Sequence, residues 1–484
     1  MKISDIIYRE EYIFSEIEDD TEFNELVTDI NSLKDGDILI IPNSLKVGRL
    51  KDFSARPTAV ICDESLSLPD HIPSIRVANP RLALSNAYFR FFSPDVSKMK
   101  LIAVTGTNGK SSTAEFIKTV LTESGISVGL IGTGKIEISG QRETDPYYSM
   151  TTPDPSMLYS TLSKMEKAGC EAVVMEVSSH ALALDKVAPL RFDYAVFTNL
   201  SPEHLDFHGD MTEYFKAKNK LFKNCKKSFF NIDDEYARRA YDLCKSEKTA
   251  IGIIWQGDVS AKNIENRGLD GISYTYSAEK FSFKMNLKLA GIYNVYNSML
   301  AAAVCIDMGI APCMVKKLLG NIDSIPGRYE IINRDISVII DYAHTSSAFL
   351  NILRELSSIK GSKSLAVVFG CGGNRDKEKR PVMAKVAEKY ADRIIVTSDN
   401  SRNEAPSEII ADIIRGFSGG CYEVIIDREE AINSAIAKAK SGDVVAIIGK
   451  GCEKYNIDNT GYHDFDEKKI VMSALQKRDG AKAK

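Results

Sequence analysis

Residues 101–113 read LIAVTGTNGKSST, an apolar run followed by a glycine-rich loop and two serines. The apolar run predicts a buried strand and KSST predicts the first turn of a helix, so the loop joins the two. At such a turn, Gly106 and Gly109 let backbone N–H groups approach phosphate oxygens. Lys110 adds a positive charge there, and the hydroxyl of Ser111 can ligate Mg²⁺. The stretch therefore predicts a nucleotide-binding loop in preference to an ordinary glycine-rich turn with a surface lysine.

The chain after this loop alternates apolar strands with amphipathic helices. The expected strands are KLIAVTG, SVGLIGT, AVVMEV, DYAVFTN, SFFNID and TAIGIIW. Helices are expected from Ser111, near residues 155–169 and at residues 211–224. Buried strands that alternate with helices indicate a mainly parallel sheet covered on both faces. Residues 267–290 instead alternate like an antiparallel excursion, and the helix NVYNSMLAAAVCIDMG is expected to end this domain.

The same pattern divides the chain into three expected domains, and its 484 residues are enough for about three cores. Residues 1–98 carry short strands such as DILIIP and TAVICD and predict a small α/β domain. Residues 99–326 form the expected central nucleotide-binding domain. Five further strand-then-helix units predict a Rossmann-like domain over residues 327–484. The expected fold class is therefore α/β throughout, with a central P-loop ATPase domain.

The composition excludes several classes of partner. A net charge of −4 gives no support for nucleic acid, and no apolar run approaches the roughly 18 residues of a membrane span. The acid-rich N-terminus is not a secretory signal. Nine scattered cysteines without a CxxC pair indicate neither a disulfide framework nor a zinc site. We expect a cytoplasmic monomer that acts on small molecules.

Polar side chains follow two of the expected central strands. Glu176 ends AVVMEV and is followed by two serines and a histidine, while the next strand leads into FTNLSPEHLDFHGD. Four of the six histidines lie in such clusters at strand ends, namely His180, His204, His208 and His344. A lone histidine is more often structural than functional, but four gathered in this way favour a site.

Several longer motifs occur together between about residues 95 and 470. They are TGTNGKSS, EVSSHAL, FTNLSPEHLDFHGD, YFKAKNKLF, LAGIYNVYNSMLAA, GRYE, DYAHT and FGCGGNRDKEKRP. In combination the chain resembles the ATP-dependent Mur ligases of peptidoglycan synthesis. TTPDP at residues 151–155 and GKGCEKY at residues 449–455 resemble the tripeptide-synthetase branch. The resemblance implies an N-domain that binds a nucleotide sugar, a central ATPase, and a C-terminal domain that brings the amino acid.

The resemblance also implies the reaction. The γ-phosphate of ATP passes to a carboxylate of UDP-N-acetylmuramoyl-L-alanyl-D-glutamate, and an amino acid then attacks the acyl phosphate. It further implies a catalytic group of Lys110, Glu176, His204 and Lys218. Ser111, Glu176, His204 and Lys218 would hold magnesium, with Lys218 carbamylated so that it offers a carboxylate in place of a cation. Lys216 and Lys220 are expected to be ordinary solvated lysines.

The implied binding residues form two sets. ATP would contact Gly106, Thr107, Asn108, Gly109, Lys110, Ser111, Ser112, Asn294, Asn297, Arg328 and Asp341, with the two asparagines facing adenine. The acceptor and the amino acid would contact Thr151, Thr152, Ser178, Lys186, Asp399, Asn400, Arg402, Gly449 and Glu453. His344 and residues 375–379 would complete the site between the domains. An ion pair between Arg328 and Asp341, without a role in nucleotide binding, is the alternative for those two residues.

The substrate side departs from the pattern of the branch. Met150, Lys186, Ser401 and Cys452 stand where the branch has asparagine, arginine, proline and histidine, and the N-domain stretch DINSLKDGDILIIPNS is divergent. Arg402 and Glu453 are retained, which favours meso-diaminopimelate over L-lysine as the amino acid.

Two alternatives to this reading stay open. One is a ligase of the same fold with another acceptor, such as folylpolyglutamate synthetase or a secondary-metabolite peptide ligase. The other is a non-catalytic paralogue that only binds nucleotide. Intact Lys110, Glu176, His204 and Lys218 argue against the second alternative, because a protein without activity has no need of all four.

Overall fold

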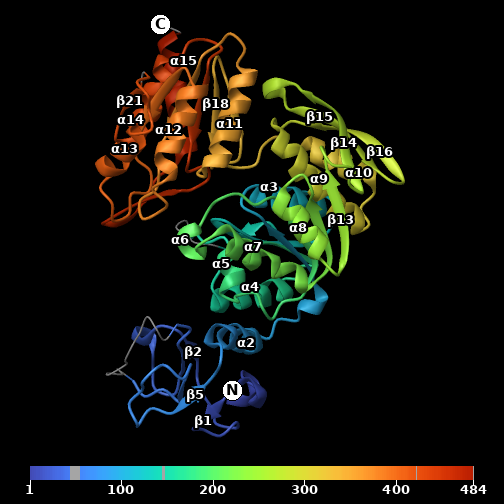
Figure 1. Cartoon of the computed structure of the whole chain (residues 1–484), viewed down its shortest axis with the longest axis vertical. Coiled ribbons are helices and arrows are strands. Elements are labelled where there is room, and N and C mark those ends of the chain that lie inside the picture. The colour runs from blue at the N-terminus through green and yellow to red at the C-terminus, as the bar shows by residue number, and fades with distance from the viewer. Residues whose placement is uncertain (44–54, 144–147, 421, 483–484) are drawn as a thin grey trace.

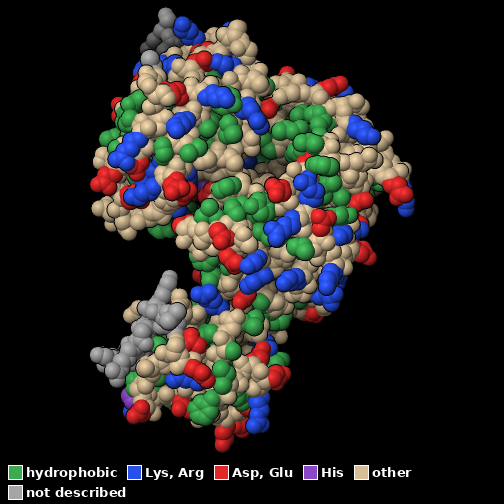
Figure 2. Space-filling model, in the orientation of Figure 1, with side chains coloured by type: hydrophobic (Ala, Val, Ile, Leu, Met, Phe, Trp, Pro, Cys, Tyr) green, Lys and Arg blue, Asp and Glu red, His purple; other side chains and the backbone are tan. Residues whose placement is uncertain are grey.

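The computed structural model describes residues 1–43, 55–143, 148–420 and 422–482. Three α/β units follow one another along the chain (Figure 1), with the N-terminal unit at one end of the molecule and the C-terminal unit at the other. Each unit has its own sheet, of five, eleven and six strands, and a separate two-stranded hairpin lies near the C-terminus. On the face shown in Figure 2, a deep notch separates the N-terminal unit from the C-terminal unit.

The N-terminal sheet has the order β1-β5-β4-β3-β2. Its strands are β1 (Phe14–Ser15), β2 (Leu26–Val27), β3 (Ile38–Ile40), β4 (Ala59–Cys62) and β5 (Ser74–Arg76). All neighbouring pairs are parallel except β1 with β5. The divergent stretch DINSLKDGDILIIPNS runs through β3, and its last residue lies outside the described residues. The segment that would grip a nucleotide sugar is therefore described only in part.

Helix α2 (Pro80–Phe92) connects this unit to the central one. Its start follows from local chemistry, because the Asn79 side chain accepts a hydrogen bond from Leu82 N–H and Pro80 occupies the first turn. The helix packs on α4 (Pro155–Lys167), and the rings of Phe89 and Tyr159 meet edge to face with centroids 5.4 Å apart. Aromatic contacts of this kind stabilise the junction between the two units.

The central sheet has the order β16-β15-β14-β13-β12-β11-β6-β10-β7-β8-β9. Its strands are β6 (Lys100–Thr105), β7 (Val128–Gly132), β8 (Lys135–Ile138), β9 (Gln141–Arg142), β10 (Ala172–Glu176), β11 (Phe192–Phe197), β12 (Cys225–Asn231), β13 (Glu247–Gly252), β14 (Val259–Asn266), β15 (Ile272–Ala278) and β16 (Phe281–Leu287). The strands from β7 to β14 in the sheet order are parallel, and antiparallel strands close both edges. The expectation of a mainly parallel sheet is confirmed.

Helices cover both faces of this sheet. They are α3 (Lys110–Glu123), α4, α5 (Ser179–Ala183), α6 (Leu205–His208), α7 (Met211–Asn219), α8 (Glu235–Leu243), α9 (Ile292–Asp307) and α10 (Pro312–Asn321). Strand β6 lies at the centre, so both of its faces are buried. Leu101 and Ala103 join the core beneath α4 and α7, whereas Ile102 and Val104 join the core beneath α3 and α9. This burial explains why β6 is almost continuously apolar.

Three expected elements differ in the structure. The helix expected at residues 211–224 ends at Asn219 and continues as a single 3-10 turn, because Lys220 N–H bonds back to Ala217 O. The antiparallel ribbon begins at β14, earlier than residue 267, and a bulge near Asn263 breaks the period-two alternation that would reveal it. The long apolar helix α9 does not end the domain, since α10 follows it.

The C-terminal sheet has the order β17-β18-β22-β19-β20-β21, parallel except for the edge strand β17. Its strands are β17 (Glu330–Asn333), β18 (Ser337–Asp341), β19 (Leu365–Phe369), β20 (Arg393–Val396), β21 (Tyr422–Val424) and β22 (Val444–Ile448). The helices are α11 (Ser346–Ile359), α12 (Lys379–Tyr390), α13 (Pro406–Ile414), α14 (Arg428–Lys438) and α15 (Glu467–Lys482), and the hairpin consists of β23 (Tyr455–Asp458) and β24 (Gly461–Asp464). The expected Rossmann-like series of strands and helices is present.

No helix in the described ranges is long and apolar enough to cross a bilayer.

Because α3 carries the first residues after the phosphate loop, its packing sets the stability of the site. We expect Leu121→Ala, on the buried face of α3 at 0% exposure, to cost about 2–5 kcal/mol and to lower the midpoint of thermal unfolding by roughly 4 °C or more. Leu243→Ala is the matched control, since Leu243 at the end of α8 is 54% exposed. Equal midpoints for the two variants would contradict this description of the core.

Candidate active site between the central and C-terminal domains

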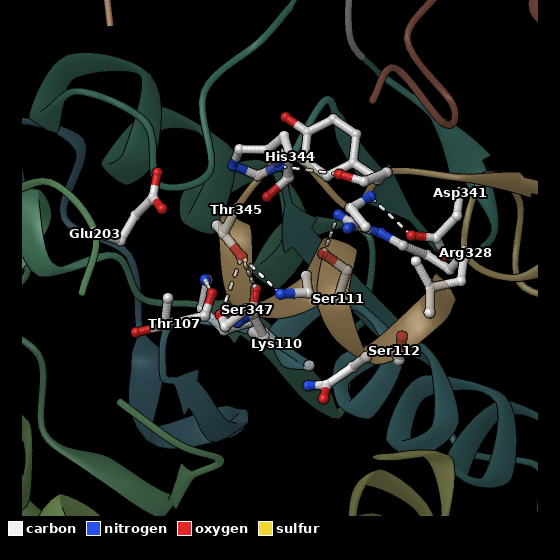
Figure 3. Close-up of a pocket in the computed structure, with 18 of the residues that line it drawn as sticks. Thr107, Lys110, Ser111, Ser112, Glu203, Arg328, Asp341, His344, Thr345 and Ser347 are labelled. Atoms are coloured by element: carbon white, nitrogen blue, oxygen red, sulfur yellow. Dashed lines mark hydrogen bonds between the residues drawn. The ribbon is translucent and has the colours of Figure 1, made fainter. Parts of the chain in front are cut away.

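A cavity of about 540 Å³ lies between the central and C-terminal domains. Loop residues 107–112 and helix α9 line it from the central domain, and residues 341–345 line it from the C-terminal domain. Figure 3 shows Lys110 and Ser111 close to Arg328 and Thr345, with Glu203 and His344 also facing the cavity. Two domains therefore share one polar cavity at the carboxyl ends of their parallel strands, where α/β folds bind ligands.

Two glycines give the loop its shape. Gly106 has φ of +147°, and a Cβ on it would lie 1.9 Å from Thr198 Oγ1. Gly109 has φ of +83°, and a Cβ there would lie 2.5 Å from Asn297 Oδ1. Both positions therefore need glycine for conformation and for space. The loop is pressed against strand β11 on one side and helix α9 on the other.

Two lysines donate to the same carbonyl oxygen of this loop. Lys110 Nζ lies 3.0 Å from Gly106 O and 2.9 Å from Thr107 O, and Lys218 Nζ lies 2.8 Å from Gly106 O. Burial lowers the pKa of Lys110, and burial together with the charge of Lys110 holds the pKa of Lys218 well below its ordinary value. These effects shift Lys218 toward its uncharged form more than an exposed lysine.

Glu176 stands at the end of β10, beside β6 in parallel register. Its carboxylate accepts hydrogen bonds from Ser111 Oγ at 3.0 Å, from Thr133 N–H at 3.0 Å and from Thr133 Oγ1 at 3.1 Å. A buried carboxylate is thus bonded to one hydroxyl group at the first turn of α3 and to another directly after β7. These are the hard oxygen donors that Mg²⁺ prefers.

The oxygen atoms around Glu176 offer a metal ion one carboxylate and the hydroxyl groups of Ser111 and Thr133. The described part of the chain contains no group of three or more His, Cys, Asp or Glu side chains arranged to hold a metal. Mg²⁺ commonly takes one or two protein carboxylates and completes its shell with water and substrate phosphate. The donors around Glu176 fit that pattern. A cluster with several carboxylates or imidazoles would suit other metals instead.

Three histidines gather beside the cavity, and one of them, His204, lines it. The ring centroid of His180 lies 4.8 Å from that of His204 and 5.5 Å from that of His208. Burial, followed by the neighbouring positive charges, lowers the pKa of His204 to about 2, and burial lowers that of His180 to about 4. Both rings are therefore uncharged at neutral pH, and His208 bonds to Ser179 Oγ at 2.9 Å.

Hydrogen bonds connect the phosphate loop directly to the C-terminal domain. Arg328 Nη2 donates to Ser111 Oγ at 2.9 Å, and Asn108 Nδ2 donates to Ser347 Oγ at 3.1 Å. Thr345 Oγ1 donates to Asn108 Oδ1 at 3.3 Å while also capping α11. The C-terminal domain is thus held against the loop by groups that a bound phosphate would also contact.

Arg328 and Asp341 do not form the plain ion pair that was the alternative for them. Arg328 reaches Ser111, and its guanidinium lies 4.2 Å from the ring centroid of Tyr342. The Asp341 carboxylate accepts the backbone N–H groups of Tyr329 and Ala343, each at 2.7 Å. Both side chains line the cavity. Their positions leave both free to take part in nucleotide binding.

Asn294 and Asn297 lie on the buried face of α9 and line the cavity. Asn294 Nδ2 donates to Ala290 O at 2.7 Å, and Asn297 Oδ1 accepts from Thr113 Oγ1 at 3.3 Å. His344 is half-buried with its Nδ1 3.0 Å from Tyr342 O, and Lys379 Nζ donates to His344 O at 2.9 Å. These residues form the wall of the cavity beyond the phosphate loop.

The C-terminal domain also lines the cavity with Asp399, Asn400, Arg402, Gly449 and Glu453. Arg402 has a left-handed backbone with φ of +53°, and its Nη1 donates to Gly373 O at 2.9 Å and to Asn400 O at 3.2 Å. Asn400 Nδ2 donates to Glu453 Oε2 at 2.8 Å. Asn400 therefore connects a fixed guanidinium and a carboxylate in the part of the cavity wall that the C-terminal domain supplies.

Some expected residues lie outside the cavity lining. Thr152 Oγ1 donates to Glu176 O at 2.9 Å and accepts from Ser178 N–H, so these two residues brace the end of β10. Lys186 forms an ion pair with Asp154 at 2.7 Å. Gly106 and Lys218 lie behind the lining, whereas Thr151 lines it. As expected, Lys216 is exposed, and Lys220, also exposed, pairs with Asp185 at 3.0 Å.

Several lining residues were not singled out in the sequence. They are Thr133, Ser201, Glu203, Tyr342, Thr345 and Ser347. Ser201 and Glu203 lie within FTNLSPEHLDFHGD, and Tyr342 and Thr345 lie within DYAHT, so membership of those motifs is the signal that could have found them. Three non-glycine residues of the cavity lining have a positive φ, namely His204, Tyr329 and Arg402. Strained backbone of this kind often occurs at functional sites.

The profile of the Mur ligase middle domain matches residues 104–305, and that of the Mur ligase glutamate ligase domain matches residues 327–451. Together these two matches include every residue of the cavity lining except Glu453.

Whole-chain relatives agree with these domain matches. A UDP-N-acetylmuramoyl-L-alanyl-D-glutamate--2,6-diaminopimelate ligase from Caldanaerobacter subterraneus subsp. tengcongensis is 40% identical over 451 residues, covering 92% of this chain and 91% of the relative. A ligase of the same name from Clostridioides difficile is 37% identical, covering 99% of this chain and 100% of the relative. A solved structure of a ligase with that name has a TM-score of 0.68 at 27% identity and covers 99% of each chain. The resemblance inferred from the motifs is therefore confirmed, and the chain belongs to the Mur ligase family.

Proposed function

We propose that this Mur ligase uses ATP and Mg²⁺ to join an amino acid, meso-diaminopimelate in preference to L-lysine, to UDP-N-acetylmuramoyl-L-alanyl-D-glutamate. The observation that carries the proposal is one cavity lined both by the glycine-rich loop of the central domain and by Arg402 and Glu453 of the C-terminal domain. The names of the full-length relatives describe the same pair of substrates. We also propose that the protein acts as a monomer, because one chain supplies every group named, and that it acts in the cytoplasm, as its nucleotide substrates require.

In this proposal the γ-phosphate of ATP lies at loop residues 107–112. A carboxylate oxygen of the acceptor attacks that phosphorus, ADP leaves, and an acyl phosphate forms. The amine of the amino acid then attacks the carbonyl carbon, and phosphate leaves with the bridging oxygen. Lys110 and Arg328 neutralise the negative charge that gathers on the phosphate oxygens. Holding both substrates in one cavity supplies most of the remaining acceleration.

Magnesium would be held by Glu176 and Ser111, with His204 nearby. When bound, it would neutralise charge on the phosphate oxygens. We propose that Lys218 contributes as a carbamate, formed when CO₂ adds to the neutral amine and a proton is released. Burial and the charge of Lys110 support this step, because they hold the pKa of Lys218 low and leave the amine able to react. The product carries a carboxylate in place of an ammonium, which relieves the repulsion between the two lysines.

The amino acid would lie against Arg402 and Glu453. Two carbonyl oxygens hold one nitrogen of the Arg402 guanidinium, and its remaining donors make no hydrogen bond to the described residues. A carboxylate at the far end of the amino acid would pair with them. The side chain of L-lysine would place an ammonium against that guanidinium instead. Ser401 in place of proline leaves the loop backbone freer, so we expect weaker preorganisation of this pocket.

The acceptor is tested by phosphate release with a panel of carboxylates and amines. We expect release only when UDP-N-acetylmuramoyl-L-alanyl-D-glutamate and an amino acid are both present. Release with a folate and glutamate, or with another acceptor alone, would move the protein to a different substrate class within the same fold. Nucleotide binding without release under any combination would identify a non-catalytic paralogue.

We expect Lys110→Ala to lose about 10²–10³ in turnover or more, because its charge acts on the phosphate in the transition state. Phosphate release at saturating substrates measures the loss, and an unchanged unfolding midpoint verifies that the variant is folded. Turnover within threefold of wild type would contradict the proposal that this loop binds the phosphates of ATP.

We expect Lys218→Ala to be nearly inactive and to recover part of its activity when acetate or formate is added. Alanine cannot form a carbamate, whereas a small carboxylate can occupy the vacated space. Lys216→Ala is the matched control, since Lys216 is an exposed lysine on the same helix whose Nζ pairs with Glu213 at 2.6 Å. Full activity of Lys218→Ala in CO₂-depleted buffer would refute the carbamate.

We expect the wild type to use meso-diaminopimelate faster than L-lysine, and Arg402→Ala to lose that preference. The reason is the loss of the guanidinium that pairs with the second carboxylate. A competition assay with both amino acids measures the ratio of the two products. If L-lysine is used faster by the wild type, or if the variant keeps the original ratio, then another residue selects the amino acid.

A further inference from the structure

Lys450 lies in the loop after β22 and is completely buried, with 0% exposure. Its Nζ donates to Asn400 Oδ1 at 2.8 Å, lies 3.4 Å from Glu453 Oε2 and lies 3.8 Å from Asp399 Oδ1. The rings of Tyr455 and Phe465 flank it, with centroids 5.7 and 5.6 Å away. Lys450 is not part of the cavity lining, whereas Asn400, Glu453 and Asp399 are. It therefore stands directly behind the end of the cavity proposed for the amino acid.

The ammonium group fixes the orientation of the Asn400 amide. A lysine can only donate hydrogen bonds, so the atom of Asn400 that faces it must be the carbonyl oxygen. The same oxygen also accepts Ile457 N–H at 3.0 Å. The amide nitrogen is thereby turned toward Glu453, to which it donates at 2.8 Å. Without Lys450, one of the two donors that hold this orientation would be lost.

Lys450 also balances two half-buried carboxylates. Burial raises the pKa of Glu453 and the charge of Lys450 opposes that rise, while the charges of Lys450 and Arg428 lower the pKa of Asp399. Arg428 is already bonded to Glu467 at 2.6 Å and to backbone oxygens. Lys450 is thus the cation that directly contacts both the Asn400 amide and the Glu453 carboxylate.

A purely structural role explains Lys450 poorly. An ammonium taken out of water is costly unless its partners repay that cost, and an apolar side chain of similar length would fit between the two aromatic rings. The polar side chains within 4 Å of Lys450 Nζ are those of Asn400, Glu453 and Asp399, and all three line the cavity. The buried charge of Lys450 therefore acts on residues of the cavity wall.

We propose that Lys450 is a positioning residue, which holds Asn400 and Glu453 in the arrangement that binds the ammonium group of the incoming amino acid. This inference rests on the proposed function. Lys450 does not touch the substrate, and it acts through the two side chains that do. Its removal should therefore weaken binding of the amino acid while leaving the phosphate loop and the acceptor unaffected.

The test is steady-state kinetics of Lys450→Met with each substrate varied in turn. We expect the KM for meso-diaminopimelate to rise at least tenfold, with the KM values for ATP and for UDP-N-acetylmuramoyl-L-alanyl-D-glutamate within twofold and kcat within about threefold of wild type. A loss of folded protein alone would lower the apparent kcat and leave every KM unchanged. Lys438→Met is the control, since Lys438 is an exposed lysine of the same domain paired with Glu423 at 2.6 Å.

Lys450→Gln is the second variant, because it keeps a hydrogen-bond donor and removes the charge. A smaller rise in the same KM is expected for it. An unchanged KM for the amino acid in either folded variant, equal rises in all three KM values, or failure of both variants to fold would overturn the proposal. If the wild type ligates no amino acid at all, the proposed function fails first, and the two failures are thus distinguished.

Discussion

The site depends on one carbonyl oxygen, that of Gly106, which accepts hydrogen bonds from the Nζ atoms of Lys110 and Lys218. Burial and the charge of Lys110 lower the pKa of Lys218, whereas the nearby Glu176 carboxylate opposes the lowering of the pKa of Lys110. In the proposed reaction, phosphate from ATP would bring negative charge to this loop from the cavity, and a carbamate on Lys218 would bring it from behind the loop. Either charge would interact favourably with Lys110.

The same loop also joins the two domains. Ser111 donates to Glu176 of the central domain and accepts from Arg328 of the C-terminal domain, and Asn108 bonds to both Thr345 and Ser347. A group that binds at the loop therefore meets residues of both domains at once. In the proposed reaction the amino acid lies against the C-terminal domain, so these hydrogen bonds would also set the distance between the phosphate and the attacking amine. Such positioning would contribute to catalysis.

The sequence predicts local features of this molecule well and long-range ones poorly. The β6–loop–α3 unit is predictable because strand, glycines and helix start are consecutive in the chain. Strand β14 is hidden by a bulge near Asn263, and the turn after α7 depends on tertiary packing. The contact of Asn108 with Ser347 joins residues 239 positions apart, so no spacing rule reveals it. Roles for Lys218 and Arg402 come from resemblance to a family, and Lys450 is recognisable only from its burial and partners.

The chemistry is tested most directly by following one oxygen atom. The acceptor, labelled with ¹⁸O in its terminal carboxylate, is incubated with ATP and meso-diaminopimelate, and the inorganic phosphate is analysed by mass. If the carboxylate takes the γ-phosphate and the amine then displaces it, one labelled oxygen leaves with each phosphate. Transfer of one ¹⁸O per amide formed is the predicted result. Amide formation with unlabelled phosphate would contradict the acyl-phosphate route and, with it, the role assigned to the Lys110 loop.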